Sequence, residues 1–304
     1  MQTLAFSFEV IIKDLGAMKY LSLYVILGVM VIAGALSYFF YKKSINDERE
    51  VLENATYTIQ NSWEFPQLLN EVSGIAWIND SIISCIHDEE GVIYDFNLNT
   101  SEIVRDIRFG PDNDYEAIAI DSVHAYIMRS DGLVFDVLDY TKDTVSVSSF
   151  QTDFSVDNNM ESLAYNPKTK MLLAVPKDKG LQKDRYKGIY TISPETKETS
   201  KKALISIDMK VKTLDSIDKK HIEDNFFPSD LAIHPKTGDY YMVDGRNLKL
   251  LILNPKGGIK ALHNLNRYHF EQPEGIAFSP EGKLFIANEA SGGVATLLEI
   301  RLKE

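Results

Sequence analysis

A short phrase recurs five times along this chain: small or acidic residues lead into an apolar residue, an alanine and a second apolar residue. The copies occupy residues 72–77, 115–120, 160–165, 228–233 and 273–278. Their alanines lie 43, 45, 68 and 45 residues apart, and a period of about 40 to 50 residues is typical of β-propeller blades, each of about four strands. We therefore predict an all-β fold, a five-bladed β-propeller over residues 55–304.

The spacing of 68 residues predicts one blade plus an insertion at about 181–227, a segment rich in Lys, Asp and Glu. This composition favours a solvated loop with a strand pair and a short helix, and a flap over the channel is the alternative. A degenerate blade within this segment would make the propeller six-bladed.

Turns and strands around the repeat are typical of blades. Three turns that follow the repeat, at residues 166–170, 234–238 and 279–283, have proline as their second residue, where its fixed φ suits a turn corner. The last blade is one strand short, whereas residues 56–60 form a β run without a blade of its own. We expect this N-terminal strand to complete the C-terminal blade, because closure of the ring removes two exposed sheet edges.

The formal net charge is −12, and no stripe of Lys and Arg with interleaved aromatic residues is present. Such a chain repels phosphate backbones, so we expect no nucleic-acid partner and favour cations or basic partners. The single cysteine, Cys85, lies in an apolar run and predicts a buried core residue. It excludes an intrachain disulfide and a cysteine-based metal site.

Residues 20–41 contain no charged side chain and meet the length of about 20 apolar residues that a bilayer-spanning helix needs. Aromatic residues end this run, and two lysines follow it, as expected where a helix reaches the lipid headgroups. We predict a single-pass transmembrane helix at 20–41, after an N-terminal extension at 1–19 and before a charged linker at 42–54. Met18 is an alternative start to Met1.

A cleaved signal peptide is the alternative, because Ala33-Gly34-Ala35 has the small residues of a cleavage site. The apolar run continues past this site through Phe40, which favours an anchor. Basic residues flank both ends of the run, so charge counting leaves the orientation open.

Acidic residues repeat at positions that should converge on one mouth of the propeller channel. The chain begins each innermost strand on the face where the second strand of that blade ends. At the strand starts stand Glu116, Glu161, Asp230 and Glu274, with Glu71 just ahead of the first copy. At the ends of the second strands stand Asp88, Glu89, Asp131, Asp244 and Glu289, interspersed with His87, Arg129, Lys177 and Arg246.

Carboxylates aimed at one axis raise each other's pKa unless a cation neutralises them. A ring of hard oxygen ligands favours Ca²⁺, which takes about six to eight oxygens, over Mg²⁺. Zinc is disfavoured, because His87 is the only histidine near the site and no thiolate is present. The nine acidic residues other than Glu71 therefore predict a Ca²⁺ site with Glu116, Glu161 and Glu274 nearest the axis. Strand capping without a metal is the alternative.

The sequence contains no G-x-S-x-G, H-E-x-x-H, P-loop or G-x-G-x-x-G motif, so no catalytic residue is assigned. Hydrolysis by metal-bound water needs none of these motifs, and the sequence therefore leaves open whether the chain is an enzyme.

Behind a short N-terminal anchor, residues 71–77 (EVSGIAW), 87–94 (HDEEGVIY), 114–119 (DYEAIA), 130–132 and 273–277 resemble the SdiA-regulated family. The resemblance covers about residues 64–302, and Ala117 stands where the family usually has glycine. It implies a five-bladed propeller related to NHL repeats, a Ca²⁺ site and an extracytoplasmic domain. We accordingly expect a periplasmic or extracellular propeller.

Two functional classes follow. The first is a membrane-tethered, monomeric propeller whose Ca²⁺-braced mouth binds a small ligand or a protein partner of unknown identity. The alternative is a Ca²⁺-dependent hydrolase that resembles the esterase-like phytase or lactonase propellers, where the same ion would polarise a phosphoryl or ester oxygen.

Overall fold

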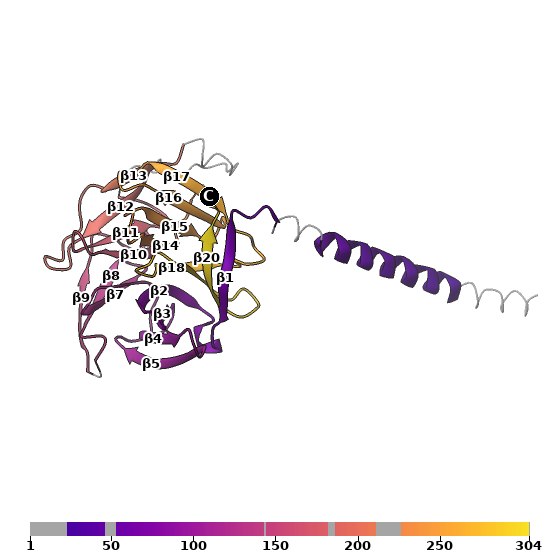
Figure 1. The fold of residues 1–304 in the computed structure, drawn as a ribbon, viewed down its shortest axis with the longest axis horizontal. Helices are drawn as coiled ribbons and strands as arrows, with labels where there is room; N and C mark the ends of the chain where they lie inside the picture. The colour runs from indigo at the N-terminus through magenta and orange to yellow at the C-terminus, as the bar shows by residue number, and fades with distance from the viewer. Residues whose placement is uncertain (1–22, 46–52, 143, 182–185, 211–225, 304) are drawn as a thin grey trace, which may run out of the picture. The chain divides into compact units, whose positions relative to one another are not determined.

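The computed structural model describes residues 23–45, 53–142, 144–181, 186–210 and 226–303. Within the unit Ala55–Glu304, the chain forms five antiparallel sheets of four strands each (Figure 1). The innermost strands β2, β6, β10, β14 and β18 contact one another in order, and β18 contacts β2 again. This closed ring is a five-bladed β-propeller, as the repeat predicted.

The first three blades take their strands in chain order. Blade 1 contains β2 (Val72–Asn79), β3 (Ile82–His87), β4 (Val92–Asn97) and β5 (Glu102–Arg108), after a short 3₁₀ helix η1 (Gln67–Leu69). Blade 2 contains β6 (Tyr115–Ile120), β7 (His124–Arg129), β8 (Leu133–Leu138) and β9 (Ser146–Gln151). Blade 3 contains β10 (Met160–Asn166), β11 (Met171–Pro176), β12 (Tyr186–Ile192) and β13 (Ile205–Asp208).

Blade 4 also takes its strands in chain order, whereas blade 5 does not. Blade 4 contains β14 (Asp230–Ile233), β15 (Tyr240–Asp244), β16 (Lys249–Leu253) and β17 (Ile259–Asn264). Blade 5 contains β18 (Pro273–Phe278), β19 (Leu284–Asn288) and β20 (Thr296–Leu302), and its fourth strand is β1 (Tyr57–Glu64) from the start of the domain. β1 pairs with β20 along its whole length. The predicted closure by the N-terminal strand is confirmed.

The segment 181–227, set aside as an insertion, contributes β12 and β13, the outer half of blade 3. The other described residues of this segment lie outside the two strands, and residues 182–185 and 211–225 are not among the described residues. The described residues form five sheets, so they do not support the six-bladed alternative.

The hairpin turns follow the predicted chemistry. β14–β15 and β18–β19 are joined through Gly238 and Gly282, with φ of 74° and 92°. The third copy of this turn has no glycine, and Lys170 takes φ of 56° at the matching position. The left-handed conformation is thus required by the turn, and glycine only makes it easier.

The hydrophobic core consists of layers between neighbouring blades. Each of five buried clusters draws its residues from two adjacent blades. The repeat's alanines, 4–8% exposed, lie one in each cluster. A methyl side chain lets the crowded inner ends of two sheets approach, whereas a larger one would overpack them. Cys85 is fully buried in one of these layers, as predicted.

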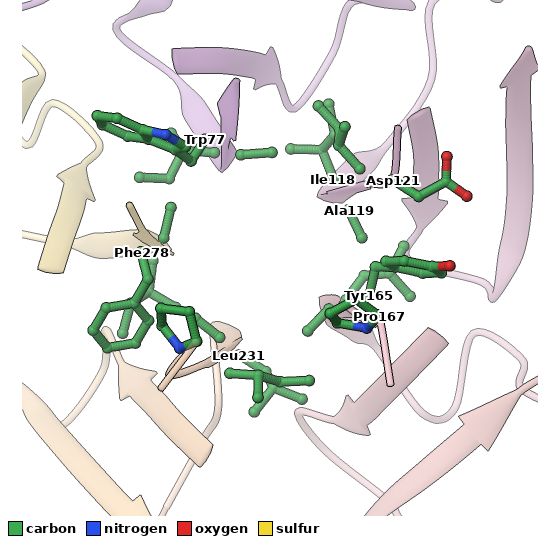
Figure 2. Close-up of a pocket in the computed structure, with 18 of the residues that line it drawn as sticks. Trp77, Ile118, Ala119, Asp121, Tyr165, Pro167, Leu231 and Phe278 are labelled. Atoms are coloured by element: carbon green, nitrogen blue, oxygen red, sulfur yellow. The ribbon is translucent and has the colours of Figure 1, made fainter. Parts of the chain in front are cut away.

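The channel is closed near its middle. The apolar residue before each alanine is only 1–2% exposed, and the five are Ile75, Ile118, Leu163, Leu231 and Ile276. Beyond them, toward the ends of the inner strands, lies a pit of about 530 Å³ (Figure 2). The two mouths of the channel are therefore separate surfaces, one at the strand starts and one at the strand ends.

Among the described residues of the unit Met1–Asn54, the helix Leu23–Ile45 is long and apolar enough to cross a membrane. A signal sequence near an N-terminus meets the same criterion. The extension 1–19 with Met18, the first residues of the predicted 20–41 span, and linker residues 46–52 lie outside the described residues.

Closure by β1 predicts that Tyr57→Ala destabilises the propeller by about 3–5 kcal/mol, the usual cost of removing a buried aromatic side chain. Tyr57 is 3% exposed, its ring centroid lies 5.2 Å from that of Phe270, and its hydroxyl lies 3.1 Å from Nδ1 of His269. Chemical denaturation measures the effect, with the exposed Thr58→Ala on the same strand as control. Equal stability of both variants would show that the ring does not depend on β1.

Candidate functional site at the acidic channel mouth

The second residue of each repeat lies at the start of an inner strand. These residues are Ser73, Glu116, Glu161, Ser229 and Glu274. In blades 1, 2, 3 and 5 the register shifts at this position, so the residue is left out of the ladder with the second strand. Such a β-bulge turns a side chain away from the regular face of its sheet. The three glutamates are thereby aimed at one mouth of the channel.

Lys177 follows β11 and lies among these three glutamates. Its Nζ forms an ion pair with Oε2 of Glu161, and its charge also acts on Glu116 and Glu274. Burial lowers the pKa of Lys177, but the glutamates outweigh burial and hold it above its usual value. Glu161 and Glu274 are 6% and 8% exposed, so this is a buried charge cluster.

Each glutamate of the cluster favours its protonated form more than a free glutamate does. Burial is the main cause of the raised pKa of Glu116, and the charge of Glu161 and a hydrogen bond with Asp114 add to it. Burial also raises the pKa of Glu161 and of Glu274, while Lys177 opposes the rise in both. The mouth therefore holds more carboxylates than its lysine neutralises.

Asp230 occupies a different place from the three glutamates, because it is the third residue of its repeat. It is 1% exposed, and its two carboxylate oxygens each accept a backbone N–H, from Leu231 and from Ile276, both at 2.8 Å. A backbone hydrogen bond from Leu163 adds a third inner strand. Asp230 thus joins the inner strands of blades 3, 4 and 5 inside the channel.

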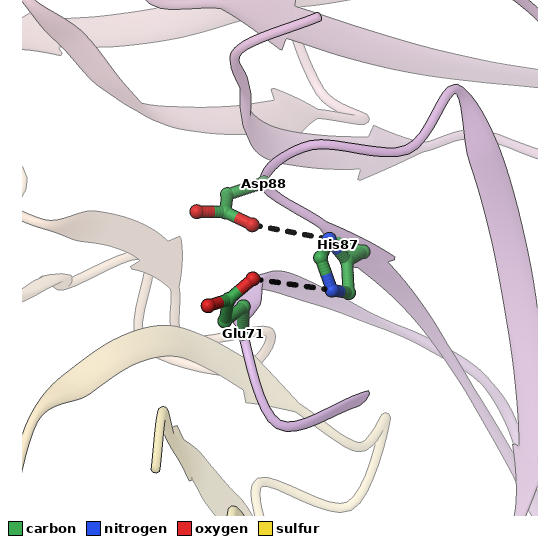
Figure 3. Close-up of side chains that lie close together, drawn as sticks. All are labelled: Glu71, His87 and Asp88. Carbon is green, nitrogen blue, oxygen red and sulfur yellow. Dashed lines mark ion pairs between the residues drawn. The ribbon is translucent and has the colours of Figure 1, made fainter. Parts of the chain in front are cut away.

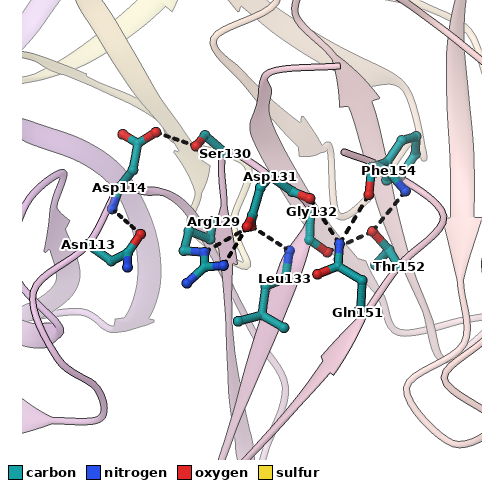
Figure 4. Close-up of polar contacts among 10 residues, drawn as sticks. All are labelled: Asn113, Asp114, Arg129, Ser130, Asp131, Gly132, Leu133, Gln151, Thr152 and Phe154. Atoms are coloured by element: carbon teal, nitrogen blue, oxygen red, sulfur yellow. Dashed lines mark hydrogen bonds and ion pairs between the residues drawn. The ribbon is translucent and has the colours of Figure 1, made fainter. Parts of the chain in front are cut away.

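Asp131 and Asp244 accept hydrogen bonds from residues near the ends of their own strands and, for Asp244, from the segment before β14. Oδ1 of Asp131 accepts Nε of Arg129 at 2.8 Å and the N–H of Leu133 at 3.1 Å (Figure 4). Asp244, fully buried, accepts the N–H of Phe227 at 3.0 Å and of Asn247 at 2.8 Å. The role of either residue in holding an ion stays a prediction.

Asp88 belongs to a second group at the same mouth, with Glu71 and His87 (Figure 3). Nδ1 of His87 lies 3.0 Å from Oδ1 of Asp88, and Nε2 lies 3.6 Å from Oε2 of Glu71. The hydrogen bond with Asp88 is the main cause of the raised pKa of His87. One donor atom of each residue lies within 4.8 Å of the others, a spacing that could hold a metal ion. Glu89, next in the chain, is exposed.

Glu289 connects the two groups. Its carboxylate accepts a hydrogen bond from Nε2 of Gln272, and burial raises its pKa to about 7. The charges of Glu274, Asp88 and Glu71 contribute to the rise, in that order. The acidic side chains of this mouth, from Glu71 to Glu116, therefore interact electrostatically as one continuous group.

Sequence reasoning named Glu116, Glu161, Glu274 and Glu289 but did not assign a role to Lys177. Its position at the end of a second strand was visible, and Glu161 lies beside it in the same blade, but its action on Glu116 and Glu274 depends on how the blades face each other. The sequence also placed Glu71, His87 and Asp88 at this mouth, but as members of one ring of residues and not as a separate group. Its signal was a histidine flanked by acidic residues at the end of the first blade's second strand.

Comparison with known proteins identifies the fold class. No family model and no curated protein sequence matches the chain. The structure is similar to glutaminyl cyclase from Myxococcus xanthus, at 13% identity and a TM-score of 0.55, over 81% of this chain and 96% of that one. It is also similar to the PQQ-bound aldose sugar dehydrogenase from Streptomyces coelicolor, at 14% identity and a TM-score of 0.50, over 82% and 99%. At these identities the likeness is one of β-propeller fold alone.

The raised pKa of Glu116 predicts how stability changes with pH. A carboxyl whose folded pKa exceeds its unfolded value stabilises the fold at acidic pH and loses this contribution as pH rises toward the folded pKa. Glu116→Gln, which stays neutral, should therefore exceed the wild type in stability by a margin that grows from pH 5 to pH 9. Thermal unfolding in the presence of chelator measures it, with exposed Glu102→Gln as control. A margin that shrinks with pH would contradict the assignment.

Proposed function

We propose that this chain is a membrane-tethered binding module of the SdiA-regulated type, whose acidic mouth holds Ca²⁺ and, beside it, a small ligand or a protein partner. The observation that supports it most is the aiming of Glu116, Glu161 and Glu274 at one point by β-bulges in three blades. Bulges re-aim side chains next to functional sites, and buried carboxylates that raise each other's pKa are a mark of such sites.

The donor chemistry fits a hard divalent cation. The cluster provides only carboxylate oxygens, the ligands that Ca²⁺ prefers. When all are ionised, three glutamates against the ammonium of Lys177 leave two negative charges, which one divalent ion balances. Glu289 lies close enough to act electrostatically on the same cluster and would be a further ligand. Bound Ca²⁺ would supply a positive centre for an anionic or carbonyl group of the ligand.

We expect millimolar Ca²⁺ to raise the melting temperature of the protein, because a ligand that binds only the folded state stabilises it by mass action. The double variant Glu116→Gln and Glu161→Gln keeps the shapes of the side chains and removes two charged ligands, so it should lose the response. Differential scanning calorimetry with Ca²⁺, Mg²⁺ and chelator measures both proteins. Identical wild-type unfolding in all three solutions would refute the metal site.

Lys177→Met should change the stabilisation by Ca²⁺ in the opposite direction from the double variant. Removing the resident ammonium leaves the glutamates without their counter-charge, so the metal-free variant should be less stable and its response to Ca²⁺ larger than that of the wild type. The exposed Lys179→Met, two residues away, is the matched control. A response to Ca²⁺ that is lost in Lys177→Met would show that the lysine supports the ion and does not compete with it.

The helix Leu23–Ile45 supports the membrane tether, and we place the propeller on the periplasmic or extracellular side. A reporter that is active only outside the cytoplasm, fused after Glu304, should be active, and a reporter that is active only in the cytoplasm should be silent. The reverse pattern would place the propeller inside the cell and make Lys42 and Lys43 the better guide to orientation.

A further inference from the structure

The pit at the mouth opposite the acidic cluster is built by equivalent residues from all five blades. Its floor is the ring of buried Ile and Leu side chains together with the repeat's alanines. Its rim is the last residue of each repeat, namely Trp77, Ile120, Tyr165, Ile233 and Phe278. A volume of about 530 Å³ falls within the range of about 300–1,000 Å³ that is typical of small-molecule sites.

The three aromatic residues of the rim are held in place by a second layer of rings. The ring centroid of Trp77 lies 5.0 Å from that of Phe285, and Tyr165 stacks on Tyr126 at 6.4 Å. Phe278 lies 4.9 Å from Tyr241. A rim fixed in this way needs little ordering when a ligand binds, which favours affinity.

Asp121 is the one charged side chain among the described residues that line the pit. Its Oδ1 accepts the N–H groups of Val123 and His124, both at 2.7 Å. Its Oδ2 has only the hydroxyl of Tyr126, at 3.4 Å, and so retains capacity for a further donor. Figure 2 shows Asp121 beside Tyr165 on one side of the pit, with its carboxylate turned outward from the centre.

We propose that this pit binds a small organic cation, with the apolar body of the ligand among the rim's aromatic rings and its ammonium group at Asp121. Aromatic faces attract cations and bury apolar surface, and a carboxylate completes recognition of an ammonium. Among the described residues, the lining offers no basic side chain, so an anionic ligand of the same shape lacks a partner there. This site is independent of the Ca²⁺ site, because the plugged channel separates the two mouths.

The test uses full-length protein in lipid nanodiscs, with empty nanodiscs as reference, and isothermal titration calorimetry. The probes are phenethylamine, the neutral 2-phenylethanol and the anionic 3-phenylpropionate. We expect the amine to bind at least tenfold more tightly than the alcohol, and the carboxylate not to bind. Asp121→Asn keeps the acceptor of the turn, so it should weaken the amine about tenfold and leave the alcohol unchanged. Ile233→Trp fills the pit and should abolish binding of both.

Two controls keep the result specific. Glu102→Gln, on the exposed outer strand β5, makes the same charge change as Asp121→Asn and should have no effect. The double variant Glu116→Gln and Glu161→Gln should also bind the amine normally. Amine binding that is lost in that double variant and kept in Asp121→Asn would move the site to the acidic mouth and overturn the proposal. Absence of binding by all three probes, or equal affinity for amine and alcohol, would overturn it as well.

Discussion

The free edges of the five innermost strands govern this structure. In each blade the innermost strand pairs on one side only, and its other edge of N–H and C=O groups faces the channel, where unpaired groups are costly when water is excluded. Two features of the fold reduce this cost. Alanines let neighbouring blades pack closely, and Asp230 accepts backbone N–H groups from the strands of three blades. The closely packed inner strands and Asp230 together form a partly polar plug that closes the channel.

The plug divides the channel into two mouths with opposite chemistry. At the strand starts, β-bulges carry Glu116, Glu161 and Glu274 out of their ladders and toward Lys177. At the strand ends, the last residue of each repeat lies at the rim of the pit. A single six-residue phrase, repeated with small changes, therefore builds an acidic surface at one end of the molecule and an apolar surface at the other.

Lys177 shows why charge in this site has to be counted across blades. Seen alone, the three glutamates suggest an empty cation site, and the lysine of blade 3 supplies one positive charge to them. Burial favours protonation of the glutamates, and this protonation reduces the remaining negative charge. The acidic mouth therefore carries several charges of both signs, whereas among the described residues the apolar pit at the other mouth has Asp121 as its one charged lining residue.

The sequence by itself predicted the class of fold, a ring of five blades with a sixth left open, the closing strand and a set of acidic residues at one mouth, because the repeat reports a local period and each blade is a local unit. It grouped Asp230 with Glu116, although Asp230 stands one position later in its repeat. The structure shows that this shift of one residue places Asp230 inside the channel, where it accepts backbone N–H groups. The partners of Lys177 and the pairing of Glu71 with His87 were also decided by tertiary structure. Glu71 and His87 meet beside the β2–β3 hairpin, and Lys177 and Glu161 meet beside the β10–β11 hairpin. The action of Lys177 on Glu116 and Glu274 joins residues of different blades, which meet only when the ring closes, and no local pattern encodes such a meeting.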